Sequence, residues 1–500
     1  MENIAFNNIP CGASIPVQNP HAVSVSLPTM ADVIGYEEND PAVISQMVSG
    51  YPRFFTNLLV KKLVAYVRLK NHVPENLELL PLTSIHAKNI LEKITGIEFK
   101  SIEESANVFL IIEKNHPELE RCKAFIRHCG LIISSRQAEF SLFQFDQVKN
   151  IFEEQKLKSE TSEPKIKQIL AEAYGAETTA VFLSNSGANA VFSIYETVRQ
   201  LRLSENRNTI VQLGCLYVDT MEIIRKRSTK SHLQINIYKK QQLENWLAEN
   251  HQNVSAIVTE IPNNPLVQCV DLPWLSLLCK QYDIVLIVDT TIGTPFNVTV
   301  LPYCDAAVES LTKFASGGGD VLMGAIVLNN ESRFAKSIAI EIQDYLVPPY
   351  EADLCRLAFQ IQDYEKRVRK VSENTRLLID YLETLSIVSE IYSVRNPLAA
   401  AEFSKIRKYE NAVPGLISIV FDKPLSHYYD RLNIPKGPTL GTEFTLAMPY
   451  VYLAHYDLAC TEMGREQLRD MGLNPELLRI SVGTEPIETI IAAFAELMHL

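Results

Sequence analysis

The sequence has 500 residues, of which 47% are apolar, and a formal net charge of -12. A chain of this length has room for two or three domains with large cores. The negative charge argues against nucleic acid and anionic membrane surfaces as partners, because both require basic patches, and no apolar run is long enough to cross a bilayer.

The nine cysteines are scattered, and none belongs to a CxxC pair. This pattern predicts free, mostly buried thiols in a reducing compartment, and it argues against a metal site. The first thirty residues also lack the basic segment and apolar core of a secretory signal. We therefore expect a cytoplasmic protein.

Residues 1–60 are expected to form an extended arm. Five prolines before residue 42 interrupt any long regular element. Val23, Val25 and Leu27 nevertheless alternate with serines as in a strand. Arms of this kind often lie across a neighbouring subunit, and the alternative is a disordered tail. Residues 61–145 follow with mixed helical and strand patterns, which predict a small α/β insertion.

Three residues in this first part of the chain are candidates for binding an anion. Tyr51 and Arg53 share one side of an extended segment, where they could hold a phosphate or belong to an ordinary turn. Arg136 is either another anion contact or a surface arginine in a salt bridge.

Residues 146–365 alternate between strand and helix patterns, which predicts a large domain with a mostly parallel sheet and helices on both faces. Residues 366–500 are expected to form a smaller C-terminal α/β domain, with a long charged helix over 350–387 as the connection. The strands are expected at 179–183, 209–213, 234–238, 255–259, 284–288, 306–309 and 324–328 in the large domain, and at 416–421 and 478–483 near the C-terminus.

A turn of small residues follows the first strand of the large domain. The run Ser184–Ala190 leads from that strand into a helix, where free backbone N–H groups and the helix dipole attract an anion. It is neither a P-loop nor a GxGxxG turn. Small residues are also common helix caps, so Ser186 and Gly187 predict either an anion site or a plain cap.

Asp289 and Lys313 lie at the ends of two neighbouring strands, and hydroxyls and glycines flank the lysine. A pyridoxal phosphate (PLP) site needs such a pair, because the lysine bonds to the cofactor and the acid keeps the pyridine nitrogen protonated. The alternative is a strand-end aspartate and a solvated lysine. Ligands of parallel sheets collect at the carboxyl ends of the strands, where both residues lie, and this favours the site.

Arg479 lies within an apolar strand near the C-terminus. A buried arginine needs a partner, which is either a carboxylate of the protein or the carboxylate of a substrate.

Seven stretches, in this order, carry a resemblance that covers nearly the whole chain. They are His21–Thr29, Val33–Glu38, Gly50–Phe55, Ile133–Arg136, Tyr217–Thr220, Gly437–Leu446 and Leu478–Gly483. With them the sequence resembles the fold-type I, PLP-dependent enzymes of the Cys/Met metabolism family, and most of all the long fungal-type cystathionine γ-synthases.

This resemblance implies a role for each matching residue. Lys313, Asp289 and Tyr51 would be catalytic, and Arg479 with Thr439 would bind the substrate. Tyr51 and Arg53 would reach the phosphate from a neighbouring subunit, so the protein would be a homo-oligomer (a dimer of dimers) with sites at its interfaces. The residues expected to bind the cofactor are Tyr51, Arg53, Ser186, Gly187, Ala188, Asn264, Asp289, Ser310, Thr312 and Lys313.

Three positions depart from the family pattern. Leu213 stands where an aromatic residue commonly stacks on the cofactor, and Tyr217 could replace it. Ala188 and Thr439 stand where methionine and serine are usual. The resemblance implies γ-replacement on an O-acylated homoserine, with cysteine as nucleophile to give cystathionine. The alternatives are γ-elimination, or replacement with another sulfur or carbon nucleophile.

Overall fold

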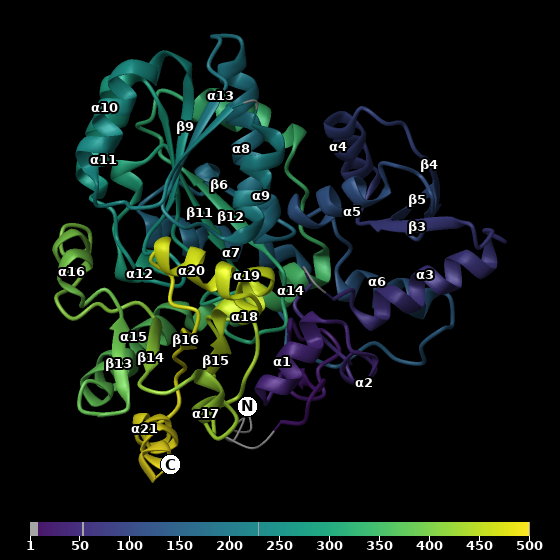
Figure 1. Ribbon diagram of the computed structural model, residues 1–500. Coiled ribbons are helices and arrows are strands. Elements are labelled where there is room, and N and C mark those ends of the chain that lie inside the picture. Colours follow the sequence, from purple (N-terminus) through teal and green to yellow (C-terminus); the bar gives the residue numbers. More distant parts are fainter. Residues whose placement is uncertain (1–8, 53–54, 229, 500) are drawn as a thin grey trace.

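The protein is described by a computed structural model that covers residues 9–52, 55–228 and 230–499. The chain forms three parts: a large sheet with helices on both faces, a small lobe beside it, and a C-terminal sheet with its own helices (Figure 1). Within the described residues, no helix is long and apolar enough to span a membrane.

The central sheet has seven strands in the order β6-β12-β11-β10-β9-β7-β8. All neighbours are parallel except those of β12, which runs antiparallel to β11 and β6. The strands are β6 (Val181–Ser184), β7 (Thr209–Leu213), β8 (Lys230–Gln234), β9 (Val254–Glu260), β10 (Val285–Asp289), β11 (Ala306–Ser310) and β12 (Gly324–Leu328).

Helices cover both faces of this sheet (Figure 1), which explains why its strands are apolar without alternation. In β10, for example, Val285 and Ile287 pack into one hydrophobic cluster, whereas Leu286 and Val288 pack into the other. The helices are α7 (Ser159–Tyr174), α8 (Gly187–Leu203), α9 (Val218–Arg227), α10 (Lys240–Asn250), α11 (Leu272–Tyr282), α12 (Thr294–Asn297) and α13 (Ala335–Glu341).

The C-terminal sheet is antiparallel, with the order β13-β14-β16-β15. Its strands are β13 (Val388–Tyr392), β14 (Leu416–Phe421), β15 (Leu446–Pro449) and β16 (Leu478–Ser481). The helices are α14 (Glu351–Gln360), α15 (Tyr364–Leu382), α16 (Pro397–Phe403), α17 (Leu425–Tyr429), α18 (Tyr450–Ala454), α19 (Tyr456–Ala459), α20 (Glu462–Asp470) and α21 (Ile487–Ala495).

The small lobe is formed by the predicted insertion. It is an antiparallel sheet of order β3-β5-β4, covered by helices. Its elements are α3 (Leu58–Lys70), β3 (Leu77–Leu82), α4 (Ile85–Thr95), β4 (Lys100–Glu104), β5 (Asn107–Glu113), α5 (Leu119–His128) and α6 (Ser135–Gln144).

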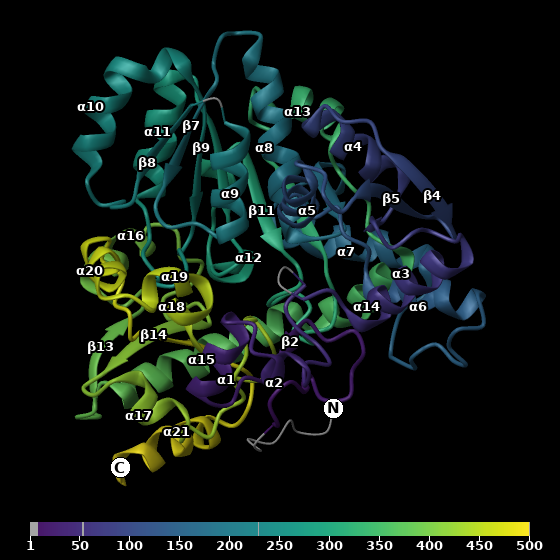
Figure 2. The same ribbon diagram turned by 45° about the vertical axis from the view of Figure 1, so that its right-hand side comes forward.

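The N-terminal segment is more structured than an extended arm. It contains β1 (Ser14–Ile15), β2 (Ser24–Val25), α1 (Met30–Glu37) and α2 (Pro41–Ile44). It packs on the C-terminal part of its own chain, as both views show (Figures 1 and 2). Buried Tyr429 donates a hydrogen bond to the Leu27 carbonyl at 2.9 Å, and the Met30 N–H donates to Asp430 at 2.8 Å.

Two expected elements are wrong in detail. The strand expected at 234–238 lies earlier, at Lys230–Gln234, because pairing with β7 sets its register. The long helix expected over 350–387 is divided into α14 and α15 by a 3₁₀ turn at Ile361–Asp363. The division into domains at 1–60, 61–145, 146–365 and 366–500 stays a prediction.

Candidate active site

A pocket of about 150 Å³ opens at the carboxyl ends of the central parallel strands. Its wall includes Asp289 from the end of β10 and Lys313 from the turn after β11, as expected for ligands of a parallel sheet. Parts of the C-terminal sheet region close the opposite side, including Arg479 of β16.

Lys313 is buried, with 6% of its surface exposed. Its Nζ donates hydrogen bonds to the Tyr51 hydroxyl at 3.2 Å and to Thr439 Oγ1 at 3.1 Å. Burial lowers the pKa of Lys313, and the nearby charge of Arg479 lowers it further, while Tyr51 acts in the opposite sense. A lysine in this environment is suited to act as a base.

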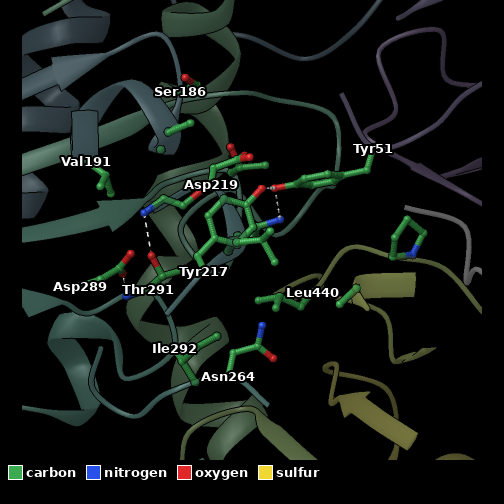
Figure 3. Close-up of a pocket in the computed structure, with 18 of the residues that line it drawn as sticks. Tyr51, Ser186, Val191, Tyr217, Asp219, Asn264, Asp289, Thr291, Ile292 and Leu440 are labelled. Carbon is green, nitrogen blue, oxygen red and sulfur yellow. Dashed lines mark hydrogen bonds between the residues drawn. The ribbon is translucent and has the colours of Figure 1, made fainter. Parts of the chain in front are cut away.

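Tyr51 and Tyr217 approach each other above the pocket floor (Figure 3). The Tyr217 hydroxyl donates to the Tyr51 hydroxyl at 3.3 Å. Burial would raise the pKa of Tyr51, but the charge of Lys313 and the hydrogen bonds from Tyr217 and Lys313 lower it overall. The Tyr51 hydroxyl therefore accepts hydrogen bonds from both Lys313 and Tyr217.

Asp289 and Glu260 are register partners on the adjacent strands β10 and β9. Asp289 accepts a hydrogen bond from the Thr291 N–H at 2.8 Å, and the Tyr217 N–H donates to Glu260. Burial raises the pKa of both carboxyls, and the charge of Asp289 raises that of Glu260 further. No cation pairs with Asp289 within the described chain, so this site favours a cationic ligand group.

The start of α8 forms a cradle for an anion. Ser186 caps the helix by accepting a hydrogen bond from the Asn189 N–H at 3.1 Å, and the free amides of Gly187 and Ala188 line the pocket. The backbone at position 187 passes close to Ser310, and this requires glycine, because a Cβ there would lie 2.7 Å from the Ser310 side chain. The backbone N–H groups and hydroxyls of this turn suit a phosphate.

Arg479 is buried in the opposite wall. Its Nη2 donates to the carbonyls of Pro438 and Thr439 at 2.9 and 3.0 Å, and its Nε has no hydrogen-bond partner among the described residues. Burial lowers the pKa of Arg479 to about 10. No carboxylate of the described chain pairs with it, which leaves the carboxylate of a ligand as the partner.

Comparison with known proteins identifies the family. The sequence profile of the family described as Cys/Met metabolism PLP-dependent enzyme matches residues 138–499. The chain belongs to this family. It is therefore a PLP-dependent enzyme of the transferase or C–S lyase type that acts on small amino-acid substrates.

Two relatives illustrate the range of this family. The L-2-amino-4-chloropent-4-enoate dechlorinase/desaturase of Streptantibioticus cattleyicolor is 34% identical over 481 residues, which is 95% of this chain and 96% of the relative. The cystathionine gamma-synthase of Neurospora crassa is 25% identical over 616 residues and covers 98% of each chain. The chemistry of the family around Cγ is thus represented by both elimination-type and replacement-type enzymes.

Solved structures show the same fold. The cystathionine gamma synthase of Xanthomonas oryzae in complex with cystathionine has a TM-score of 0.59 and 19% identity, over 68% of this chain and 87% of that one. The cystathionine gamma-lyase of Lactobacillus plantarum complexed with L-serine has a TM-score of 0.57 and 19% identity, over 68% and 86%. The predicted fold type I is confirmed.

The pocket fits PLP. Asp289 would pair with the protonated ring nitrogen, Lys313 would hold the cofactor covalently, and the cradle of Ser186 and Gly187 would take the phosphate. The Asn264 Oδ1 is buried without a hydrogen-bond partner among the described residues, as expected for a contact to the ring hydroxyl. Ser310 and Thr312 line the same part of the pocket. We propose these roles on the fit of the donor groups.

The single chain already brings Tyr51 to the site. Tyr51 reaches Lys313 within the same chain, because the segment before it packs on its own C-terminal sheet. That Tyr51 and Arg53 reach the phosphate from a neighbouring subunit, and that residues 1–60 form an arm on that subunit, stays a prediction. Arg53, the other residue of the pair, lies outside the described residues.

The structure also decides the positions of Arg136, Leu213 and Tyr217. Arg136 is not an anion contact or a surface residue but is buried, with bonds to Glu154 and Asp353. Leu213 is buried in β7 and does not line the pocket, whereas Tyr217 does, so Tyr217 is our candidate for stacking on the cofactor ring.

Glu260 is recognisable in the sequence as a strand-end residue, but the sequence assigned it no role. It ends a buried strand as Asp289 does, and the structure adds that the two carboxyls are register partners. Thr439, expected at the substrate, bonds to Lys313.

Proposed function

We propose that this enzyme expels a leaving group from Cγ of an L-α-amino acid. The observation that carries this is the buried pair of Lys313 and Arg479 in one pocket, where burial favours the uncharged amine of the lysine and no carboxylate of the described residues pairs with the arginine. Arg479 would bind the α-carboxylate, and this places Cα and Cβ beside Lys313.

Lys313 would take the proton from Cα and would then transfer protons at Cβ and Cγ of the substrate. When bound, PLP supplies the electron sink that stabilises negative charge next to the amino group. Thr439 and Tyr51 hold the Nζ of Lys313 from two directions, so its proton can return to Cα or Cγ without leaving the pocket.

The wall near Arg479 indicates what kind of side chain the pocket accepts. Apart from Arg479 and Tyr450, the C-terminal residues that line it are apolar: Pro438, Leu440, Met448, Leu453 and Ala454. Such a wall favours a short substrate side chain without a charge close to Cγ.

Two outcomes follow expulsion of the leaving group. Our first candidate is γ-replacement on an O-acylated homoserine with cysteine, which gives cystathionine, and the cystathionine gamma-synthases similar over nearly the whole chain support it. The second candidate is γ-elimination, which the 34% identity to a dechlorinase/desaturase favours.

Product analysis separates the two candidates. The holoenzyme is incubated with O-acetyl- or O-succinyl-L-homoserine, with and without cysteine, and the products are identified by mass spectrometry. Replacement predicts cystathionine when cysteine is present. 2-Oxobutanoate that persists at the same level with cysteine present would instead establish elimination, and no product from either ester would refute both candidates.

A further inference from the structure

A second cavity of about 590 Å³ lies beside the active pocket. We call it the second chamber. It is bounded by α3, β3 and α5 of the small lobe and by the segment 132–136. Pro52, Arg127, Ile132 and Leu322 line both cavities, so the second chamber and the active pocket share one wall.

Most charged groups of the second chamber are already paired. Arg136 is bound to Asp353, and Arg68 donates to the carbonyls of Pro74 and Leu77, both at 2.8 Å. Lys123 forms an exposed ion pair with Glu120 at 3.0 Å. These side chains stabilise the walls of the second chamber and have little capacity left for a ligand.

Three other charged side chains of the second chamber have no ion-pair partner among the described residues. Lys61 of α3 lies 4.0 Å from the centre of the Phe55 ring but has no carboxylate partner within the described residues. Arg127, at the end of α5, contacts only the ring nitrogen of His128 at 3.4 Å among the polar groups described. Glu78 of β3 likewise has no cationic partner in the described chain. Exposed Lys61 and Arg127 and half-buried Glu78 thus line a single space, with no ion-pair partner among the described residues.

This combination of charges is complementary to a free amino acid. A carboxylate binds well to arginine and lysine, and an ammonium group binds well to a carboxylate. Because Arg127 lines both cavities, a molecule that it holds would sit next to the active pocket. Lys61, Glu78 and Arg127 also lie outside residues 138–499, which match the family profile.

We propose that the second chamber binds the second substrate, an amino acid whose carboxylate contacts Lys61 and Arg127 and whose ammonium group contacts Glu78. This inference rests on the proposed replacement reaction and specifies the class of its nucleophile. A nucleophile bound there would be positioned to enter the active pocket past Arg127, after the leaving group has departed.

Binding of an unreactive probe tests the second chamber without turnover. The probe is 3-(methylthio)propionate, which has a carboxylate but neither an amine nor a free thiol, and its affinity for the holoenzyme is measured by titration calorimetry. The double variant Lys61→Ala/Arg127→Ala should weaken binding by about tenfold or more, as loss of charged hydrogen bonds does. Glu78→Gln should not weaken it, because the probe has no ammonium group.

The controls separate the second chamber from the active pocket. The double variant Lys62→Ala/Arg121→Ala removes one charge from each of the same two helices. Neither Lys62 nor Arg121 lines the second chamber, so this variant should bind the probe with unchanged affinity. Arg479→Ala should also retain probe binding. No saturable binding to the unmodified holoenzyme, or binding lost in Arg479→Ala but kept in Lys61→Ala/Arg127→Ala, would overturn the proposal.

A kinetic measurement then connects the second chamber to the reaction. If cystathionine forms, Glu78→Gln and Arg127→Ala should each raise KM for cysteine by about tenfold, with a smaller change in KM for the acylhomoserine. An equal rise in both would contradict the assignment. Failure of the replacement reaction itself would appear as absence of cystathionine while the probe still binds, so the two failures are distinguishable.

Discussion

Among single residues, Lys313 carries the largest consequence for both activity and stability. It is a buried amine that donates hydrogen bonds to the hydroxyls of Tyr51 and Thr439 and has no carboxylate partner among the described residues. The fold therefore keeps this amine for its chemistry rather than for an ion pair, since a buried ammonium without a carboxylate is unfavourable.

Replacement of Lys313 by methionine should abolish turnover and covalent attachment of the cofactor. It should also stabilise the apoprotein at neutral pH. Burial lowers the pKa of Lys313, so folding at neutral pH must either discharge or desolvate this amine, and both cost free energy. Thermal unfolding of both apoproteins measures the second effect. A variant less stable than the unmodified apoprotein, or one that still binds PLP covalently, would contradict this account.

Glu309 gives a second prediction at this scale. It is buried, and it accepts hydrogen bonds from Tyr174 at 2.8 Å and from Tyr364. Burial raises the pKa of Glu309 to about 7. A carboxyl with a raised folded pKa stabilises the fold below its unfolded pKa, and this contribution is lost as the pH rises through 7.

Glu309→Gln should remove this pH dependence. Relative to the unmodified protein, the variant should gain on the order of 3 kcal/mol in free energy of unfolding between pH 4.5 and pH 8. Urea unfolding at the two pH values measures this difference. A constant difference between the two proteins would show that Glu309 does not change its protonation in this range.

Among the structural elements, the end of α5 and the start of α8 are tightly joined. Gly130, which follows α5, has a φ of +64°, and a Cβ there would lie 2.3 Å from Ser186 Oγ. The Asn185 side chain donates to the Gly130 carbonyl at 2.9 Å across the same joint. The small lobe therefore supports the turn that we assign to the cofactor phosphate.

Gly130→Ala should reduce PLP affinity by about tenfold or more, because the displaced Ser186 loses its position at the phosphate. Gly96→Ala is the matched control. Gly96 has a φ of +74° in the same lobe, but nothing lies within 4 Å of its added Cβ. Alanine at either position is strained by about 1 kcal/mol because φ is positive, but only alanine at position 130 collides with Ser186. Equal PLP affinity in the two variants would refute the link between the lobe and the phosphate turn.

For the whole molecule, the main question is whether one chain makes a complete site. The structure places Tyr51 against Lys313 of the same chain, and the expected dimer of dimers stays a prediction. Inactive Tyr51→Phe and Lys313→Ala chains, mixed under conditions that exchange subunits, should therefore recover no activity. Recovery toward a quarter of the normal activity, roughly the share expected if one site in each mixed pair is intact, would show that the tyrosine comes from a neighbour.

The sequence allowed much of this arrangement to be predicted. The strand-end positions of Asp289 and Lys313 and the helix-capping Ser186 follow from local patterns, because parallel strands bring their carboxyl ends together. The path of the N-terminal segment could not be predicted, since contacts such as Tyr429 with Leu27 join residues about 400 positions apart. The burial of Arg136 could not be predicted either, because its partner Asp353 lies 217 positions away in the sequence.

The measurement that tests the central claim most directly compares leaving groups at Cγ and Cβ. The holoenzyme is given O-acetyl-L-homoserine or O-acetyl-L-serine, and the release of acetate is followed. We predict release from the homoserine ester that is faster than from the serine ester and that disappears in Lys313→Ala. Release from the serine ester alone, or release that persists without Lys313, would contradict the assignment of this pocket to chemistry at Cγ.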